Sequence, residues 1–165
     1  MVSAFVGVSM RLASFDQSTR VTGFAILEDG VPVKHGIIDM SKEGDVPDRI
    51  KHMFLAIYQI IEECRPDEVV VEATQQQANP KAVEMLSVLQ GGIICSCYIK
   101  KLDVTSLMPS EWRKILHFQQ GGGVKRPELK AQSIKYVKEN FGLDVSEDEA
   151  EAICIGRAEY LRLKE

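Results

Sequence analysis

Three apolar stretches with the length and alternation of β-strands occupy the first forty residues. They cover residues 11–17, 21–30 and 31–40, and the last two meet at Asp29-Gly30, a dipeptide that favours a tight hairpin turn. Strands joined by connections this short pair in the antiparallel sense. The pattern therefore predicts a three-stranded antiparallel meander.

Beyond the meander, helical and strand patterns alternate along the chain. The expected elements are, in order, a helix opened at 45–47 and ended before Pro66, a strand at 67–73, a helix at 79–99, a strand at 102–108, and helices at 109–116, 126–142 and from 146 onward. Strands separated by helices usually lie parallel in one sheet. We therefore expect an α/β fold with a mixed five-stranded sheet, antiparallel at first and then parallel, with helices on both faces.

The helix expected at 79–99 has no charged residue between Met85 and Ile99. A helix with one face in water shows a polar stripe, so the missing stripe indicates that both faces are covered. The sheet covers one face, and we expect a second copy of the chain to cover the other. The predicted dimer contacts are Met85, Leu86, Leu89 and Ile93.

With 165 residues, 45% of them hydrophobic, the chain is expected to form one domain over 1–165, with residues 1–10 as a leader or arm of unassigned role. No apolar run approaches the ~20 residues of a membrane span, and the start lacks a signal-peptide pattern. We therefore expect a cytoplasmic protein without membrane contact. The cysteines form no CxxC pair and are expected to be reduced and buried, with a structural zinc site as the less favoured alternative. They are Cys64, Cys95, Cys97 and Cys154.

Two acids follow apolar strands at positions where an isolated charge is costly. Asp16 ends the first strand, and Glu72 ends the strand at 67–73. Asp16 has an ordinary alternative role, because aspartate commonly accepts hydrogen bonds within its own turn. Glutamate does this less readily. We expect both carboxylates at one edge of the sheet, where sites in open α/β folds are built.

Four carboxylates lie within five positions at the start of the last helix, at Glu147, Asp148, Glu149 and Glu151. Ser146 and Glu149 have the spacing of a capping box. Asp148 and Glu151 lie about 60° apart on a face that continues with apolar residues, so they are expected to point into the protein. The helix dipole contributes less than ~1 kcal/mol per charge, whereas desolvation costs several. A divalent cation would complete this inward pair, with Glu147 left at the surface as the nearest substitute.

The acids at the strand ends and on this helix form an all-oxygen set, which favours Mg²⁺ or Mn²⁺ over zinc. Two such ions ~3.5–4 Å apart suit phosphodiester hydrolysis. The segment 112–138 carries seven Lys and Arg residues against one acid, Glu128. By itself this segment is typical of a solvated helix face, but a nuclease with acids at its centre needs cations that attract phosphates. Lys130 is expected to reach a phosphate near the start of its helix.

Five stretches, in this order, resemble the RuvC-type Holliday junction resolvases of the ribonuclease H-like superfamily. They are FDQSTRVTGFAIL, VVVEATQQQANPKAVEMLSVLQGGI, PSEWRKIL, KRPELKAQSI and EDEAEAICIG. The resemblance covers about residues 11–161 and is closest to the short phage-encoded branch. If the chain is phage-encoded, the expected cytoplasm is that of the host cell. It implies a mixed five-stranded sheet with flanking helices. It also implies a homodimeric endodeoxyribonuclease that resolves four-way and other branched DNA by paired symmetric nicks leaving 5′-phosphates.

Matched residue by residue, the family's active-site lysine falls on Lys130, and its metal-binding acids fall on Asp16, Glu72, Asp148 and Glu151. Aspartate is usual at the last of these, so the longer side chain of Glu151 could shift the metal or change the preference between magnesium and manganese. Gln75 stands where well-known bacterial members carry an aromatic residue that stacks on a base, which leaves sequence preference open. Two ions per site are implied, without a small-molecule cofactor. The residues expected to contact DNA are Arg113 or Lys114, Lys125, Arg126, Lys130 and Gln75.

Three other functions remain open on the sequence. The DQST stretch also resembles the phosphate loop of actin-like sugar kinases, but those phosphotransferases need two lobes and an adenosine-binding glycine motif, which this chain lacks. A non-cleaving branched-DNA-binding protein of the same fold would not need all four acids. The sequence poorly distinguishes an RNA-processing nuclease from a DNA junction resolvase.

Overall fold

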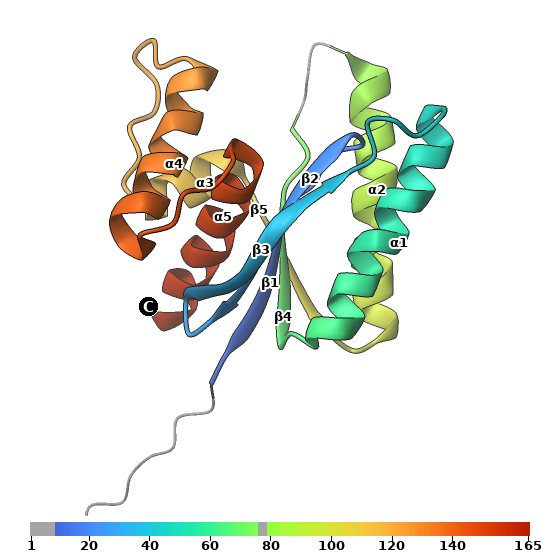
Figure 1. Cartoon of the computed structure of the whole chain (residues 1–165), viewed down its shortest axis with the longest axis horizontal. Helices are drawn as coiled ribbons and strands as arrows, with labels where there is room; N and C mark the ends of the chain where they lie inside the picture. The colour runs from blue at the N-terminus through green and yellow to red at the C-terminus, as the bar shows by residue number, and fades with distance from the viewer. Residues whose placement is uncertain (1–8, 76–78) are drawn as a thin grey trace, which may run out of the picture.

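The computed structural model describes residues 9–75 and 79–165, which form a five-stranded sheet between two sets of helices (Figure 1). Of the leader predicted at residues 1–10, only Ser9 and Met10 are described, and the Met10 N–H donates to Asp29 at 3.0 Å. Each strand and helix predicted from the sequence occurs within a few residues of its expected position. The elements are β1 (Arg11–Asp16), β2 (Val21–Glu28), β3 (Val31–Asp39), α1 (Val46–Cys64), β4 (Glu68–Glu72), α2 (Pro80–Ile99), β5 (Asp103–Leu107), α3 (Pro109–Ile115), α4 (Arg126–Phe141) and α5 (Glu147–Lys164).

The strand order in the sheet is β3-β2-β1-β4-β5. β1 pairs antiparallel with β2, and β2 with β3, whereas β1–β4 and β4–β5 are parallel. The mixed sheet predicted from the sequence is therefore confirmed. The β2–β3 hairpin turns at Asp29 and Gly30, whose φ angles of 49° and 78° are left-handed, as a type I′ turn requires.

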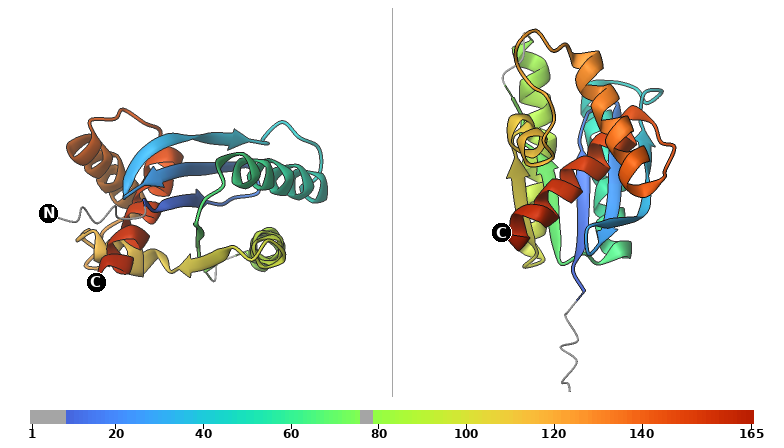
Figure 2. Two further views of the ribbon diagram at one scale, coloured as in Figure 1. Left: turned by 90° about the horizontal axis from the view of Figure 1, so that it is seen from below. Right: turned by 90° about the vertical axis from the view of Figure 1, so that its left-hand side faces the viewer.

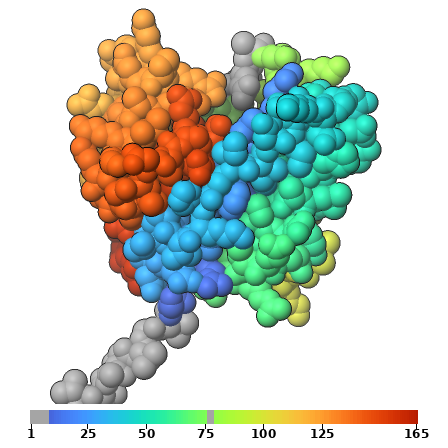
Figure 3. All heavy atoms as spheres, viewed as in Figure 1, coloured from blue at the N-terminus to red at the C-terminus, as the bar shows by residue number. Residues whose placement is uncertain are grey.

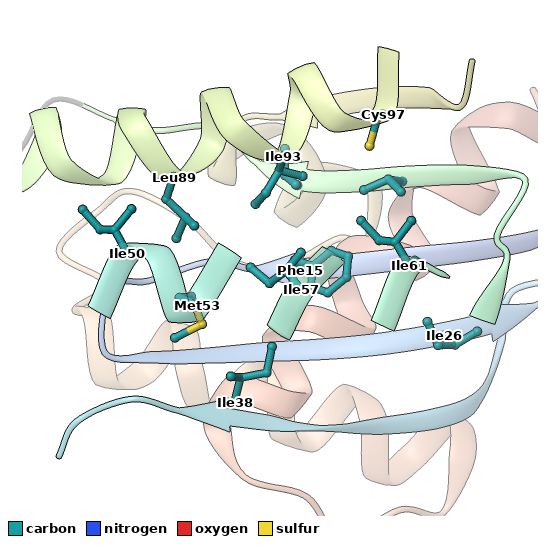
Figure 4. Packing of buried hydrophobic residues seen from close by; sticks show 13 residues of the cluster. Phe15, Ile26, Ile38, Ile50, Met53, Ile57, Ile61, Leu89, Ile93 and Cys97 are labelled. Carbon is teal, nitrogen blue, oxygen red and sulfur yellow. The ribbon is translucent and has the colours of Figure 1, made fainter. Parts of the chain in front are cut away.

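Helices cover both faces of the sheet, as predicted. α1 and α2 pack on one face around a core that includes Phe15, Ile57, Leu89 and Ile93 (Figure 4). α5 lies on the other face, where it contacts four strands, and α3 and α4 pack against α5 (Figure 2). The edge strand β3 lies at the surface between the two helical sides (Figure 3). Because α5 rests directly on the strands, the acids that α5 carries have a fixed position relative to the sheet.

Small residues let α5 lie directly on the sheet. A Cβ atom at Gly156 of α5 would lie 2.7 Å from the Ser14 hydroxyl oxygen of β1, so only glycine fits without displacement. The Ser14 hydroxyl in turn donates to the Ala152 carbonyl at 2.7 Å. At the other end of the contact, Gly23 of β2 lies against the first turn of the helix. These close approaches bring the start of α5 to the end of β1.

The residues on the exposed face of α2 differ from those that the sequence predicted. Leu89 and Ile93 are 1% and 0% exposed, because they pack against α1 and the sheet of their own chain. Their assignment to a dimer contact was therefore wrong, and Met85 and Leu86 are partly buried against the same core. The large apolar residues that α2 exposes are Val88, Tyr98 and Ile99, and Cys95 is also exposed.

The cysteines are free, as predicted, but only Cys97 and Cys154 are buried. Cys95 lies exposed on α2, because this position faces away from α1 and the sheet, so the prediction of burial was wrong there. Cys64 is half-buried at the end of α1.

α2 is long and apolar enough to cross a membrane by length and composition. The expectation that no apolar run approaches this size was therefore wrong. In this fold the composition has another explanation, since Leu89, Ile93 and Cys97 fill the core with α1 while the opposite side of α2 is exposed. The helix is one layer of the folded structure.

Candidate active site

The acids predicted from the sequence lie at the edge of the sheet where β1 and β4 end. The parallel pairing of these strands places Asp16 and Glu72 at the ends of neighbouring strands. Asp148 and Glu151 reach the same edge from the first turns of α5. All four side chains line one cleft of about 840 Å³.

Three of these acids form a tight cluster. Asp16, Asp148 and Glu151 each offer a carboxylate oxygen, and these oxygens all lie within 4.8 Å of one another. Burial, followed by the charges of Glu72, Glu151 and Asp148, raises the pKa of Asp16 well above its usual value. The turn that follows β1 is closed by Ser18 and Thr22 with hydrogen bonds of 3.0 Å, so the turn does not depend on the Asp16 carboxylate.

Glu72 lies beside this cluster, and hydrogen bonds hold both its side chain and its backbone carbonyl. Its side-chain Oε1 accepts a hydrogen bond of 2.8 Å from the indole N–H of Trp112. Its backbone carbonyl accepts hydrogen bonds from the side-chain amides of Gln17 and Gln90. Burial raises the pKa of Glu72, and the Trp112 hydrogen bond only partly offsets this. Sequence reasoning missed these partners, although Gln90, a large polar residue in an apolar helix, was an available signal.

Two cations face the cluster from α3 and α4. Lys130 Nζ lies 2.9 Å from Glu147 Oε2 and 4.0 Å from Glu151 Oε2. Partial burial alone would lower the pKa of Lys130, but its pairing with these two glutamates raises the pKa above the usual value. Arg113 Nη2 lies 3.5 Å from Glu151 Oε1. The cleft therefore places positive side chains directly beside its acids.

The residues predicted to contact DNA divide into two groups. Lys114 and Lys125 are exposed and do not line the cleft. This difference favours Arg113 over Lys114 as the second basic contact, which the sequence left open. The residues that line the cleft are Gln75, Arg113, Arg126 and Lys130.

The carboxylates at the start of α5 have different environments. Ser146 and Glu149 form the predicted capping box, in which Glu149 Oε2 accepts from the Ser146 N–H at 3.0 Å. Glu149 Oε1 also lies 2.8 Å from His35 Nδ1 on β3, a contact that the sequence did not suggest. Glu147 is exposed, and the remaining two acids turn into the cleft.

The donor set of the cluster fits a divalent cation. Carboxylate oxygens are the ligands that Mg²⁺ and Mn²⁺ prefer, and Asp16, Asp148 and Glu151 supply them together. Taking several carboxylates out of water is costly unless a cation balances them. Within residues 9–75 and 79–165 neither histidine nor cysteine belongs to this group, which argues against zinc. These three acids could hold a metal, with Glu72 as a further ligand.

The chain is similar to proteins of one known family. A family model described as crossover junction endodeoxyribonuclease RuvC matches residues 13–154. The crossover junction endodeoxyribonuclease RuvC of Trichlorobacter lovleyi is 26% identical and the alignment covers 94% of this chain and 89% of that protein. The RuvC of Hydrogenovibrio crunogenus is also 26% identical, over 93% of this chain and 90% of that protein.

Two solved structures share the fold. T. thermophilus RuvC in complex with a Holliday junction substrate has a TM-score of 0.76 at 13% identity, covering 94% of this chain and 96% of that one. The yeast mitochondrial Holliday junction resolvase has a TM-score of 0.62 at 13% identity, covering 92% and 78%. Since the family model spans most of its length, the chain belongs to the RuvC family of crossover junction endodeoxyribonucleases.

Proposed function

We propose that the chain is an endodeoxyribonuclease that resolves Holliday junctions and other branched DNA by metal-dependent hydrolysis of phosphodiesters. The observation that carries this proposal is the cluster of Asp16, Asp148 and Glu151, whose carboxylate oxygens lie within 4.8 Å of one another in a cleft lined by Arg113 and Lys130. Membership of the RuvC family supports it. Acids that bind metal beside cations that bind phosphate are the groups that this reaction needs.

The four acids would hold Mg²⁺ or Mn²⁺, and we propose two ions per site. When bound, such ions supply Lewis acidity, which activates a water molecule and stabilises the leaving oxygen. Lys130 and Arg113 lie within 4.0 Å and 3.5 Å of Glu151, so they would hold the phosphate against the acids. Arg126 and Gln75 would contact DNA along the cleft, with Lys114 and Lys125 outside it.

We further propose a homodimer in which two clefts nick opposed strands and leave 5′-phosphates. A junction has paired strands to cut, and a second copy of the chain supplies the second cleft. The exposed apolar residues of α2, namely Val88, Cys95, Tyr98 and Ile99, form the surface that this copy would cover. Each protomer would act as one domain over residues 1–165, in the cytoplasm, with neither a membrane partner nor a small-molecule cofactor.

A panel of substrates tests this function. The purified protein is incubated with a synthetic four-way junction, a linear duplex, a flap and an RNA-containing junction, each in Mg²⁺, Mn²⁺ or EDTA. We expect the four-way junction to be cut in at least one metal and not in EDTA, with the linear duplex left largely intact. Binding without cutting in either metal would show a non-cleaving branched-DNA-binding protein. A preference for the RNA-containing substrate would show an RNA-processing nuclease.

A further inference from the structure

Trp112 is the single tryptophan of the chain and is fully buried in α3. The indole nitrogen can donate one hydrogen bond and accept none. In this protein that bond goes to the carboxylate of Glu72, with 2.8 Å between Trp112 Nε1 and Glu72 Oε1. Any acceptor within the core would satisfy the N–H of a buried tryptophan. In this protein the acceptor is an acid of the cleft.

The Trp112 ring is fixed by its surroundings. The ring of Phe118 packs edge-on at 5.8 Å between centroids, and the guanidinium of Arg113 lies 4.6 Å from the Trp112 ring centroid. The rest of the indole lies in the apolar cluster beneath α5, with Val70 and Ile153 among its members. An aromatic ring packed on several sides has little freedom to rotate, so the direction of its N–H is set by the core.

Glu72 is fixed at its backbone as well. Gln17 and Gln90 donate to its carbonyl oxygen, and Gln90 also donates to the Ser106 hydroxyl at 2.9 Å. With the backbone held from one side and Oε1 held from the other, the side chain between them has few rotamers left. Oε2 is the carboxylate oxygen without this indole contact.

We propose that Trp112 is a positioning residue for the metal site: its N–H occupies Oε1 of Glu72 and thereby presents Oε2 to the cation. This inference rests on the proposed metal-dependent function. Outer partners of this kind orient ligating carboxylates, and their removal typically weakens metal binding by about 10–100-fold. The adjacent residue, Arg113, contacts Glu151 at 3.5 Å, so α3 restrains two of the acids through consecutive side chains.

The first test compares Mn²⁺ binding by calorimetry in DNA-free protein for the wild type and three variants. Trp112→Phe keeps an aromatic ring and removes the N–H, Phe118→Leu disturbs the packing and keeps the N–H, and Glu72→Gln changes the ligand itself. We expect Trp112→Phe to bind Mn²⁺ about tenfold more weakly or worse, with Phe118→Leu within about twofold of the wild type. Equal affinity for Trp112→Phe and the wild type would overturn the proposal, as would an equal loss in both aromatic variants, because that would show a packing role.

Glu72→Gln separates this inference from the proposed function. A loss of Mn²⁺ affinity in Glu72→Gln without any loss in Trp112→Phe refutes the positioning role alone. Unchanged affinity in Glu72→Gln refutes the metal assignment of Glu72, and the positioning role falls with it.

The second test needs no change at Trp112, so it stands even if Trp112→Phe does not fold. A single tryptophan gives a single indole N–H signal in a ¹H–¹⁵N correlation spectrum. We expect this signal to shift saturably as Mg²⁺ is added to the wild type, and to lose that response in Glu72→Ala. A signal at the same position in the wild type and in Glu72→Ala would contradict the hydrogen bond and the proposal.

Discussion

Gly23 lies so close to Asp148 that a Cβ atom at position 23 would come within 1.9 Å of the Asp148 carbonyl oxygen. Gly23 is also the residue that pairs with Asp16 across β1 and β2. Because β2 has no side chain at this point, the first turn of α5 can bring Asp148 next to Asp16. The carboxylate cluster thus depends on a position that carries no functional group.

Replacing Gly23 by alanine should therefore disturb both folding and metal binding. The added methyl meets backbone, which cannot rotate away, so we expect a loss of about 1–3 kcal/mol in the free energy of unfolding, the range for overpacked sites. Mn²⁺ affinity should fall as Asp148 moves away from Asp16. Gly44→Ala is the matched control, since no atom of another element in residues 9–75 and 79–165 lies within 4 Å of a Cβ there. Denaturant unfolding and calorimetry of both variants check this, and a Gly23→Ala protein with wild-type stability and Mn²⁺ affinity would contradict it.

Without metal, the negative charge of the carboxylate cluster should lower the stability of the folded protein. The folded-state pKa of Asp16 is raised, mainly by burial and then by neighbouring acids. The folded protein therefore binds more protons than the unfolded chain. As a result, stability falls as pH rises from the unfolded pKa of Asp16 to its folded pKa. In EDTA at pH 7 we expect Asp16→Asn to be more stable than the wild type by on the order of 1 kcal/mol, or about 2–4 °C in Tm. The gain should shrink as pH falls from 7 towards about 4, the usual pKa of aspartate, and be absent below that pH. Thermal unfolding in EDTA decides this, and a lower Tm for Asp16→Asn at pH 7 would refute it.

The cap of α5 should contribute stability with the opposite pH dependence. Burial alone would raise the pKa of Glu149, but hydrogen bonds from His35 and Ser146 hold it below its usual value. The contribution is therefore complete above the unfolded pKa of about 4.3 and is lost as pH falls through the lower folded value. We expect Glu149→Ala to lose about 1 kcal/mol at pH 7 and progressively less below about pH 4.

Glu139→Ala, which removes only an exposed partner of Lys135, is the control for this cap and should change stability little. Glu149→Gln should still cut junctions. If a well-folded Glu149→Gln protein is inactive, Glu149 belongs to the active site and one of the four acids has been assigned wrongly.

The exposed face of α2 should control assembly. Val88 is 56% exposed there, so Val88→Asp places a charge on the surface proposed to meet the second copy without touching the core. We expect this variant to be monomeric in analytical ultracentrifugation at concentrations where the wild type is dimeric. Val33→Asp on β3, a site 54% exposed, should leave the dimer intact. A Val88→Asp protein that remains dimeric would exclude this face of α2.

Local patterns were sufficient to predict the elements of this fold. The Asp29-Gly30 turn, the left-handed Gly142 after α4 and the Ser146 cap of α5 each follow from the conformational preference of one or two residues. The exposed face of α2 could not be predicted in the same way. Leu89 and Val88 are similar in hydropathy, and a helix that is apolar all round has no periodicity to distinguish the core side from the exposed side.

The candidate site likewise has one part that local patterns predict and another part that they do not. Strand ends and helix register placed Asp16, Glu72, Asp148 and Glu151 in one cleft, because these features need only short-range rules. The contacts that hold these elements in place were not predicted. His35 meets Glu149 across 114 positions of the chain, and Trp112 meets Glu72 across 40, so both depend on how distant elements pack.

In the proposed mechanism the acids of the cleft hold metal for cutting, while other residues bind the DNA. The most direct test measures cutting and binding together on a four-way junction labelled on each strand, for the wild type, Asp16→Asn and Glu72→Gln, in Mg²⁺ and in Mn²⁺. The wild type should nick two opposed strands and leave ends that a ligase can reseal without added kinase. Both variants should bind the junction with wild-type affinity and cut it at least about a hundredfold more slowly, the size of loss expected for a group that stabilises the transition state. Wild-type cutting rates in the two variants, or loss of junction binding in both, would contradict this division of roles.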